Sequence, residues 1–229
     1  MYDDLDTLVR TRLSWHMLAE HVVSPARYSA IGRIGLELSS GGYATPWFAV
    51  ANGDQRVAVD GVTLSVESRT AAGVSARGRE ITTLRECADF VGVTPGAPSN
   101  VYPPATPLDL DASLAIDAAA GRALSEWWQQ MQAGLQSLLA AAGSDAGITL
   151  WPEHIDLATS FNAVNYGASP GDGWHRAPYL YVGPHSGPGD DPFWNAPFGA
   201  ARSWTEVSSA DEAVDFLTQG RALAASGRG

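Results

Sequence analysis

A chain of 229 residues with 45% apolar side chains is long enough to bury a sizeable core, as one large domain or as two smaller units. Its formal net charge of −11, without a basic cluster, argues against nucleic-acid binding, because phosphate groups are bound by a concentrated positive field. The chain contains no lysine, which excludes Schiff-base chemistry, covalent attachment of pyridoxal phosphate, and the lysines of phosphate-binding loops and kinases.

The sequence carries no signal for membrane insertion. No apolar run approaches the ~20 residues that span a bilayer, and the first residues, MYDDLD, are acidic where a secretion signal is basic. We therefore expect a soluble cytoplasmic protein without a membrane or nucleic-acid partner. The pattern predicts no cofactor and no particular oligomeric state. The single cysteine, Cys87, falls in a helical apolar pattern and is predicted to be part of the core.

The N-terminal part is predicted to begin with a helix and to continue as a sheet. Apolar spacing predicts a helix from Leu5 to about Val23, ended before Pro25. Strands are expected over residues 33–38, over the run TPWFAV at 45–50, and in a hairpin joined at Asp60-Gly61.

Two helices and a connection follow. Thr83 and Glu86 have the spacing of a capping box, which predicts a short helix that stops near Gly92. Residues 94–110 are rich in Pro and Gly and are predicted to be a linker. The longest helix is expected from about Ser113 to Ala142, with Asp111 as its cap and Gly143 as its stop.

In the C-terminal part, residues 155–161 and 179–182 alternate as strands do. Between them, residues 167–171 match the G-x-S-x-G pattern of a nucleophilic serine. Pro170 follows that serine directly where a helix should begin, so we interpret the stretch as a loop. The loop at 183–199 is aromatic, which fits either a functional lid or a packed covering.

Three stretches recur in the same order in the two halves. Residues 33–36 match 154–157, residues 45–50 match 177–182, and the closing helices share a capping box and an Asp-Phe pair. These matches predict an α+β fold in which two related sheet-plus-helix repeats, an internal duplication, surround a long central helix. The first repeat would cover residues 1–93, the linker 94–110, the central helix 111–143 and the second repeat 147–229, together forming one compact domain.

The chain also resembles an uncharacterised bacterial, actinobacterial-type family known only as a domain of unknown function. The likeness rests on the stretch Ile155-Asp156-Leu157-Ala158, the Gly/Pro loop and the strand from Pro178 to Val182. It implies an architecture and no known activity or cofactor.

The pair His154 and Asp156 is the sharpest candidate site. On a strand, residues two apart share a face, so an imidazole and a carboxylate could serve as catalytic acid and base. With His175 or His185 as a third ligand they could instead hold a metal, and in the plainest interpretation they only face water. No metal-ligand motif such as HExxH supports the metal, so none is predicted.

Aromatic residues supply the walls of the candidate site. Tyr179 and Tyr181 fall on the strand face opposite Leu180 and Val182, and Trp47 holds the matching place in the first repeat. Together with Trp174 and His175, these aromatics are predicted to line a ligand-binding pocket beside His154 and Asp156, set between the repeats.

Two functions therefore stay open. The first is the binding, with or without chemical transformation, of a small molecule in a polar-aromatic pocket of the second repeat. The alternative is a non-catalytic scaffold or protein-interaction module, in which the same aromatics are core and there is no pocket.

Overall fold

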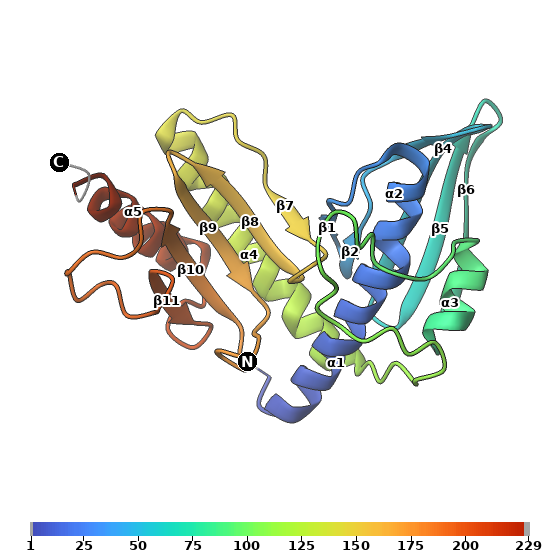
Figure 1. Cartoon of the computed structure of the whole chain (residues 1–229), viewed down its shortest axis with the longest axis horizontal. Coiled ribbons are helices and arrows are strands. Elements are labelled where there is room, and N and C mark those ends of the chain that lie inside the picture. The colour runs from blue at the N-terminus through green and yellow to red at the C-terminus, as the bar shows by residue number, and fades with distance from the viewer. Residues whose placement is uncertain (1, 227–229) are drawn as a thin grey trace. The chain divides into compact units, whose positions relative to one another are not determined.

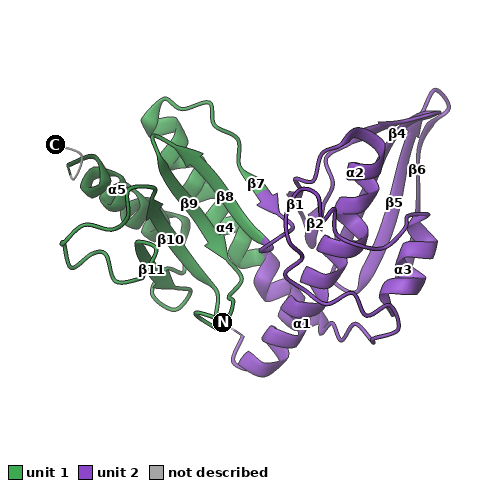
Figure 2. Ribbon diagram, viewed as in Figure 1, with its two compact units in different colours: residues 1, 126–149, 156–229 green, residues 2–125, 150–155 purple. Residues whose placement is uncertain are grey.

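A computed structural model describes residues 2–226, which divide into two units (Figure 2). Unit 2 consists of residues 2–125 and 150–155, and unit 1 consists of residues 126–149 and 156–226. The segment 94–110, which we expected to be a linker, lies inside unit 2. The chain instead passes from one unit to the other within a helix, between Ser125 and Glu126.

Three consecutive helical segments open unit 2: α1 (Leu5–Leu18), the π-helix η1 (Ala19–Val23) and α2 (Ser24–Ile31). The prediction that the helix ends before Pro25 is wrong, because Pro25 lies in the first turn of α2. Proline has no N–H to offer the carbonyl four residues back, which belongs to His21. That carbonyl instead accepts a hydrogen bond from the Gly96 N–H, at 3.0 Å, so the helical path continues without an unbonded group.

The sheet of unit 2 is antiparallel, in the order β1-β2-β4-β5-β6, with β3 paired to β4 (Figure 1). Its strands are β1 (Glu37–Ser39), β2 (Gly42–Ala44), β3 (Phe48–Val50), β4 (Gly53–Asp60), β5 (Thr63–Thr70) and β6 (Gly73–Glu80). The sequence did not predict β6. Its residues, GVSARGRE, are nearly all exposed, so they carry no alternation of apolar and polar side chains.

The short helix predicted after the capping box is present as α3 (Leu84–Val91), which follows the last strand of this sheet. The Thr83 hydroxyl oxygen accepts a hydrogen bond from the Glu86 N–H at 3.2 Å, and the helix ends at Gly92, whose φ is 85°. Cys87 is fully buried, which confirms its place in the core. Tyr43 donates a hydrogen bond to the Trp15 carbonyl at 2.7 Å and so ties α1 to the sheet.

The long helix α4 (Ala118–Ala142) begins later than predicted. Asp117 caps it by accepting hydrogen bonds from the N–H groups of Ala119 and Ala120, at 3.0 and 2.8 Å. The predicted cap, Asp111, instead pairs with the Arg85 guanidinium at 2.8 Å. The helix stops at Gly143, as expected, because that residue adopts a left-handed φ of 61°.

Unit 1 contains the second antiparallel sheet, in the order β11-β10-β9-β8-β7. Its elements are β7 (Thr149–Trp151, at the boundary between the units), β8 (Asp156–Phe161), β9 (Val164–Ser169), β10 (Tyr179–Pro184), β11 (Ala200–Ser203) and the helix α5 (Ala210–Ser226). The interpretation of residues 167–171 as loop is wrong for the first three, which belong to β9. Ser169 ends that strand and accepts a hydrogen bond from the Gly171 N–H, at 3.2 Å.

The missed strand β9 follows an unusual hairpin turn. Asn162 and Ala163 connect β8 to β9 and have φ values of 51° and 57°. This left-handed geometry is typical of Asn-Gly turns, and an alanine in the second position gives no sequence signal for it.

One face of the unit 1 sheet packs on helices. Leu180 and Val182 of β10 are fully buried, as predicted for the helix side of that strand, and Val182 packs closely against Gly220 of α5. The Trp128 indole N–H of α4 donates to the Ala168 carbonyl at 3.3 Å. Figure 1 shows α5 and the C-terminal part of α4 behind this sheet. The opposite face is therefore the one free to carry a site.

The helices and the two antiparallel sheets confirm the α+β fold. The internal duplication stays a prediction. Of the two strands that the sequence repeat equates, β3 pairs only with β4, whereas β10 pairs with both β9 and β11. Among the described residues, no helix is both long and apolar enough to cross a membrane.

Candidate functional site

His154 and Asp156 do not share a strand face, so this prediction is wrong. β8 begins at Asp156, while His154 lies exposed in the turn before it. Ile155 between them has a φ of 50°, which is rare for a β-branched residue and turns the chain out of the extended path. The two residues also belong to different units, His154 to unit 2 and Asp156 to unit 1.

Asp156 instead contacts another residue of the predicted site, Tyr181. The Tyr181 hydroxyl on β10 donates a hydrogen bond to Oδ2 of Asp156 on β8, at 2.5 Å. The strand between them, β9, places Gly167 directly beside Tyr181. A Cβ on Gly167 would overlap the Tyr181 phenol, so glycine is what allows the ring to lie across β9.

The Tyr181–Asp156 pair is held with its proton on the tyrosine. Burial, the Asp156 charge and the hydrogen bond together raise the pKa of Tyr181 well above its ordinary value of 10.0. Asp156 is 8% exposed. The pair is therefore a fixed donor and acceptor, placed just beneath the surface of the sheet.

A second carboxylate, Asp172, organises the loop before β10. Its Oδ2 accepts from the Tyr179 hydroxyl at 2.8 Å, and its Oδ1 accepts from the N–H groups of Trp174 and His175, at 2.8 and 2.9 Å. This arrangement is an Asx turn, which folds a short loop onto its own side chain. Burial, followed by the hydrogen bond to Asp172, raises the pKa of Tyr179. The loop thereby carries Trp174 and His175 to the same face as the tyrosines.

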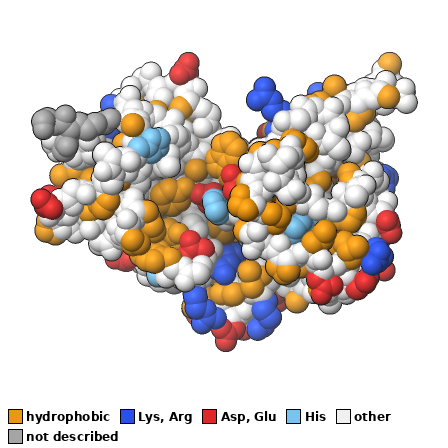
Figure 3. Space-filling view, viewed as in Figure 1, with side chains coloured by type: hydrophobic (Ala, Val, Ile, Leu, Met, Phe, Trp, Pro, Cys, Tyr) orange, Lys and Arg blue, Asp and Glu red, His pale blue; other side chains and the backbone are white. Residues whose placement is uncertain are grey.

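The rings on this face contact one another, and we call them the aromatic face: Trp174, His175, Tyr179, Tyr181 and Phe198. The Trp174 ring centroid lies 5.0 Å from that of Phe198 and 5.3 Å from that of Tyr179, both edge to face. Tyr179 is buried, whereas Trp174 is 46% exposed. Figure 3 shows apolar side chains on the visible surface of both units, while charged side chains are scattered singly or in mixed groups.

His175 has a defined tautomer. Its Nδ1 lies 2.8 Å from the Ala177 carbonyl oxygen, so Nδ1 carries the proton and donates it. In the neutral ring Nε2 is then left as an acceptor. His175 can therefore accept a hydrogen bond from a ligand at the edge of the aromatic face.

Phe198 was missed as a site residue. The 183–199 loop was predicted to be either a functional lid or a packed covering, and its aromatic residues contact two different parts of unit 1. Phe193 packs against Phe216 of α5, with ring centroids 5.2 Å apart, whereas Phe198 joins the aromatic face. Phe198 lies two residues before β11, a strand that the sequence did not predict, so no signal separated it from the other aromatics of the loop.

The remaining predicted residues lie elsewhere. Trp47 belongs to unit 2, where the Arg69 guanidinium lies 4.2 Å from its ring centroid. His185 is exposed and bonds the Asn165 side chain at 2.9 Å. Within residues 2–226, no three His, Cys, Asp or Glu side chains are grouped so that they could hold a metal ion, so the alternative metal site finds no support.

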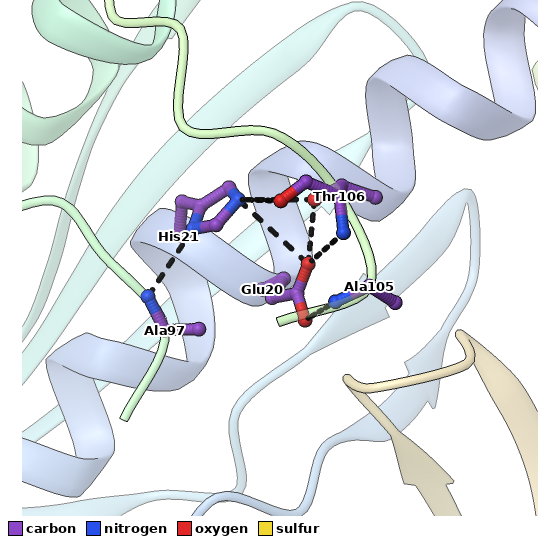
Figure 4. Close-up of polar contacts among 5 residues, drawn as sticks. All are labelled: Glu20, His21, Ala97, Ala105 and Thr106. Carbon is purple, nitrogen blue, oxygen red and sulfur yellow. Dashed lines mark hydrogen bonds and ion pairs between the residues drawn. The ribbon is translucent and has the colours of Figure 1, made fainter. Parts of the chain in front are cut away.

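Unit 2 contains a buried acid and imidazole that the sequence analysis did not single out (Figure 4). Glu20 and His21 lie on η1 and are 0% and 1% exposed. The Glu20 carboxylate accepts hydrogen bonds from the Ala105 N–H, the Thr106 N–H and the Thr106 hydroxyl, at 2.9, 2.8 and 2.5 Å. The Ala97 N–H donates to Nδ1 of His21 at 3.2 Å. These bonds anchor the Pro/Gly-rich segment to the helix. Short π-helical segments such as η1 are frequent at functional sites.

Comparisons of this chain with family models, with curated proteins and with solved structures found no match. Function is therefore argued from the geometry of the site alone.

Proposed function

We propose that the aromatic face of unit 1 binds a small organic molecule. The observation that carries this proposal is the Tyr181–Asp156 hydrogen bond, which holds a polar pair under a largely apolar surface. Small-molecule sites typically combine a hydrophobic lining with a few fixed polar groups. Trp174 supplies the exposed ring for stacking, and Tyr181, Asp156 and His175 supply the fixed polar groups.

The exposure of Trp174 supports the same proposal. An indole that is 46% exposed leaves a large apolar area in water, although the neighbouring rings of Tyr179 and Phe198 could have covered it. Exposed apolar patches with polar rims commonly mark ligand or partner sites. The Asx turn at Asp172 fixes the indole in place, so binding would order little additional chain.

The charge around the face indicates the class of ligand. Asp156 and Asp172 both lie beside the rings, and the net charge of the chain is −11. An anionic ligand would be repelled, whereas a cation is attracted both by the carboxylates and by the faces of the rings. We therefore propose a neutral or cationic ligand with a flat or apolar body. Binding alone is proposed, because only Asp156 of the predicted catalytic pair lies on this face.

A second candidate function is favoured by the packing of the rings. Centroid separations of 5.0 to 6.2 Å mean that the aromatics already fill much of the face with one another. A surface of this kind can also receive an apolar side chain of another protein. The scaffold or interaction module is therefore the alternative to a small-molecule site.

A ligand screen followed by thermal unfolding tests the proposal. A ligand that binds only the folded protein stabilises it by about 2.7 kcal/mol at a hundred times its dissociation constant. Neutral and cationic aromatic compounds should raise the unfolding midpoint, and Trp174→Ala should remove that rise. Trp151→Ala is the matched control, since Trp151 is 38% exposed but stands at the edge strand β7. Midpoints that no compound raises, or that respond equally in the two variants, would exclude the small-molecule site.

A further inference from the structure

The strand β6 leaves one edge of the unit 2 sheet open. It is the last strand in the order β1-β2-β4-β5-β6, and Figure 1 shows it at the outer side of this sheet. The Ile81 N–H donates to the Val62 carbonyl at 2.8 Å, and the antiparallel register with β5 gives every second residue of β6 the same orientation. The residues between them direct their N–H and C=O groups away from β5, and we call them the outward residues: Val74, Ala76, Gly78 and Glu80.

The backbone groups of the outward residues have no hydrogen-bond partner within residues 2–226. The strand is eight residues long, contains no proline and pairs with β5 without a bulge. All of its residues are exposed except Arg79, which is half-buried. An open edge of this length is a template for a further strand, and proteins usually shorten, bulge or cover such edges.

The other described edges are short or already bonded. Beside β1, Leu36 and Leu150 exchange two backbone hydrogen bonds of 2.9 Å each. On the four-residue β11, the Asn195 side chain bonds both the N–H and the carbonyl of Ala201, at 2.9 and 3.1 Å. The strands β3 and β7 have only three residues each. The long open edge of β6 is therefore exceptional among the described strands.

Two arginines of β6 turn toward α3 and leave the edge itself free. Arg77 lies directly opposite the buried Val66, so it shares the core face of the sheet. Its guanidinium donates to the Phe90 carbonyl at 2.5 Å and lies 4.3 Å from the centroid of the Phe90 ring. Arg79 pairs with Glu86 at 2.8 Å. Arg77 is exposed, and none of the described carboxylates forms an ion pair with it.

The two faces of β6 indicate which side chains a strand paired with it would carry. A residue opposite Arg77 shares the face of Arg77, and an opposite charge is favoured there. The other face carries Val74, which is 66% exposed, and the small residues Ala76 and Gly78. Apolar side chains of an added strand fill the space above the small residues and cover Val74. The fitting occupant is therefore an extended segment in which acidic and apolar residues alternate.

Charge argues against a second copy of this chain as the occupant. In an antiparallel pair of two β6 strands, one register bonds all four outward residues of each copy. That register places Arg77 opposite its own counterpart, because Arg77 stands at the centre of the outward residues. Like charges directly opposite each other destabilise a sheet, whereas a separate acidic segment meets no such repulsion at Arg77.

We propose that the free edge of β6 receives an extended segment of another protein as an additional antiparallel strand, with an acidic side chain of that segment opposite Arg77. Backbone hydrogen bonds to the outward residues supply the affinity, and the alternating side chains supply the specificity. The antiparallel direction continues that of the sheet, whose strand pairs are all antiparallel. This inference does not rest on the aromatic face, because β6 belongs to unit 2 and the aromatic face to unit 1.

Two N-methylated peptides test the backbone pairing. Both have the sequence Ser-Val-Glu-Val-Glu-Val-Ser with blocked ends, and one is methylated at its glutamates, the other at its valines. In an antiparallel strand with its glutamates on the Arg77 face, the valine N–H groups point toward β6 and the glutamate N–H groups point away. In calorimetric titration of the full chain, only the glutamate-methylated peptide should bind. Binding that survives methylation of the valines, or binding by neither peptide, would overturn the proposal.

Ala76→Pro blocks the edge and keeps the bonds to β5. Proline is tolerated on an edge strand where its missing N–H would face solvent, as the N–H of Ala76 does. This variant should lose peptide binding, whereas Ala76→Thr, which keeps the N–H, should bind as the wild type does. Wild-type affinity in Ala76→Pro would contradict the proposal.

Arg77→Glu tests the side-chain specificity. It should weaken binding of the glutamate-methylated peptide by about fivefold or more, and it should favour a peptide with arginine in place of glutamate. Arg69→Glu is the matched control, because it makes the same charge change on β5, which is paired on both sides. A damaged edge would bind neither peptide better than before. An Arg77→Glu variant that still prefers the glutamate peptide would exclude Arg77 as the specificity residue.

Amide hydrogen exchange in the wild-type protein keeps the test independent of how the variants fold. In the free protein, the amides of Ser75, Arg77 and Arg79 should exchange slowly because they bond β5, and those of the outward residues should exchange quickly. The glutamate-methylated peptide should slow the exchange of the outward residues. Outward amides that are already protected in the free chain, in a dimer that Ala76→Pro dissociates, would show that a second copy occupies the edge and would overturn the proposal.

Discussion

Tyr181 donates a hydrogen bond to Asp156, at 2.5 Å, across a whole intervening strand. Gly167 on that strand makes the contact possible, because any side chain there would occupy the space of the phenol. The candidate site of unit 1 therefore depends on a residue that has no functional group of its own.

Gly167→Ala tests this dependence. The added Cβ should push the Tyr181 ring away from Asp156 and destabilise the fold by about 1–3 kcal/mol, as overpacking does. Gly147→Ala is the matched control in the same unit, because a Cβ at Gly147 meets nothing within 4 Å. Chemical unfolding of both variants measures the difference. Equal tolerance of alanine at the two glycines would show that the Tyr181 ring does not lie against Gly167.

Tyr181→Phe measures the hydrogen bond itself. Removing the donor from a carboxylate that is 8% exposed should cost about 2 kcal/mol of the free energy of unfolding. In the double variant with Asp156→Asn the cost should not be additive, because the partner has changed as well. Tyr2→Phe removes a similar Tyr–Asp contact, to Asp117 at 3.2 Å, from an exposed position and should change stability little. Additive costs at Tyr181 and Asp156 would argue against their coupling.

Ala163→Gly should stabilise the protein. Ala163 has a φ of 57° in the hairpin turn between β8 and β9, a conformation that glycine adopts without steric cost. We expect a gain of about 1 kcal/mol in the free energy of unfolding. Ala72→Gly, in the exposed turn between β5 and β6, should instead lower stability, since Ala72 is not among the residues of positive φ. A loss of stability at both positions would show that the β8–β9 turn has another geometry.

Acid should weaken the fold through His16. Its pKa in the folded protein is lowered below 6.5, chiefly by burial, with Glu20 opposing and His154 adding to the shift. The unfolded chain then binds more protons than the folded protein below pH 6.5, so stability is full above that pH and falls as the pH drops through it. One such group can contribute at most about 1.4 kcal/mol per pH unit.

His16→Gln provides the control for this effect. In this variant, the free energy of unfolding should depend less on pH between about pH 7.5 and 5.5, a range in which the carboxylates are still charged. Denaturant unfolding at several pH values gives the comparison. An unchanged slope in His16→Gln would show that other groups cause the acid sensitivity.

Much of the fold could be predicted because its signals are local. The capping box at Thr83 and the stop at Gly143 depend on neighbouring residues, and both were placed correctly. The continuation through Pro25 could not be predicted, because the bond that permits it comes from Gly96, far along the chain. The exposed strand β6 carried no apolar pattern by which it could be recognised.

The candidate site was predictable in part for the same reason. Strand alternation correctly put Tyr179 and Tyr181 opposite the helix side and on the face of Asp156. The predicted pairing of His154 with Asp156 was wrong, because Ile155 has a left-handed φ of 50° that breaks the strand alternation. A β-branched residue gives no sequence signal for this backbone conformation. The bonds around Glu20 could not be predicted, because Ala105 and Thr106, which donate to its carboxylate, lie more than 80 residues further along the chain.

The central claim is that ligand binding resides in unit 1 and requires Asp156. The most direct test is the ligand-induced thermal shift of Asp156→Ala beside that of Glu37→Ala, each first shown to be folded. Glu37 is the control because it lies on β1 of unit 2 and pairs with Arg56 at 3.2 Å. We predict that Asp156→Ala abolishes the shift and that Glu37→Ala keeps it. Equal losses in both variants, or a loss confined to Glu37→Ala, would contradict the account.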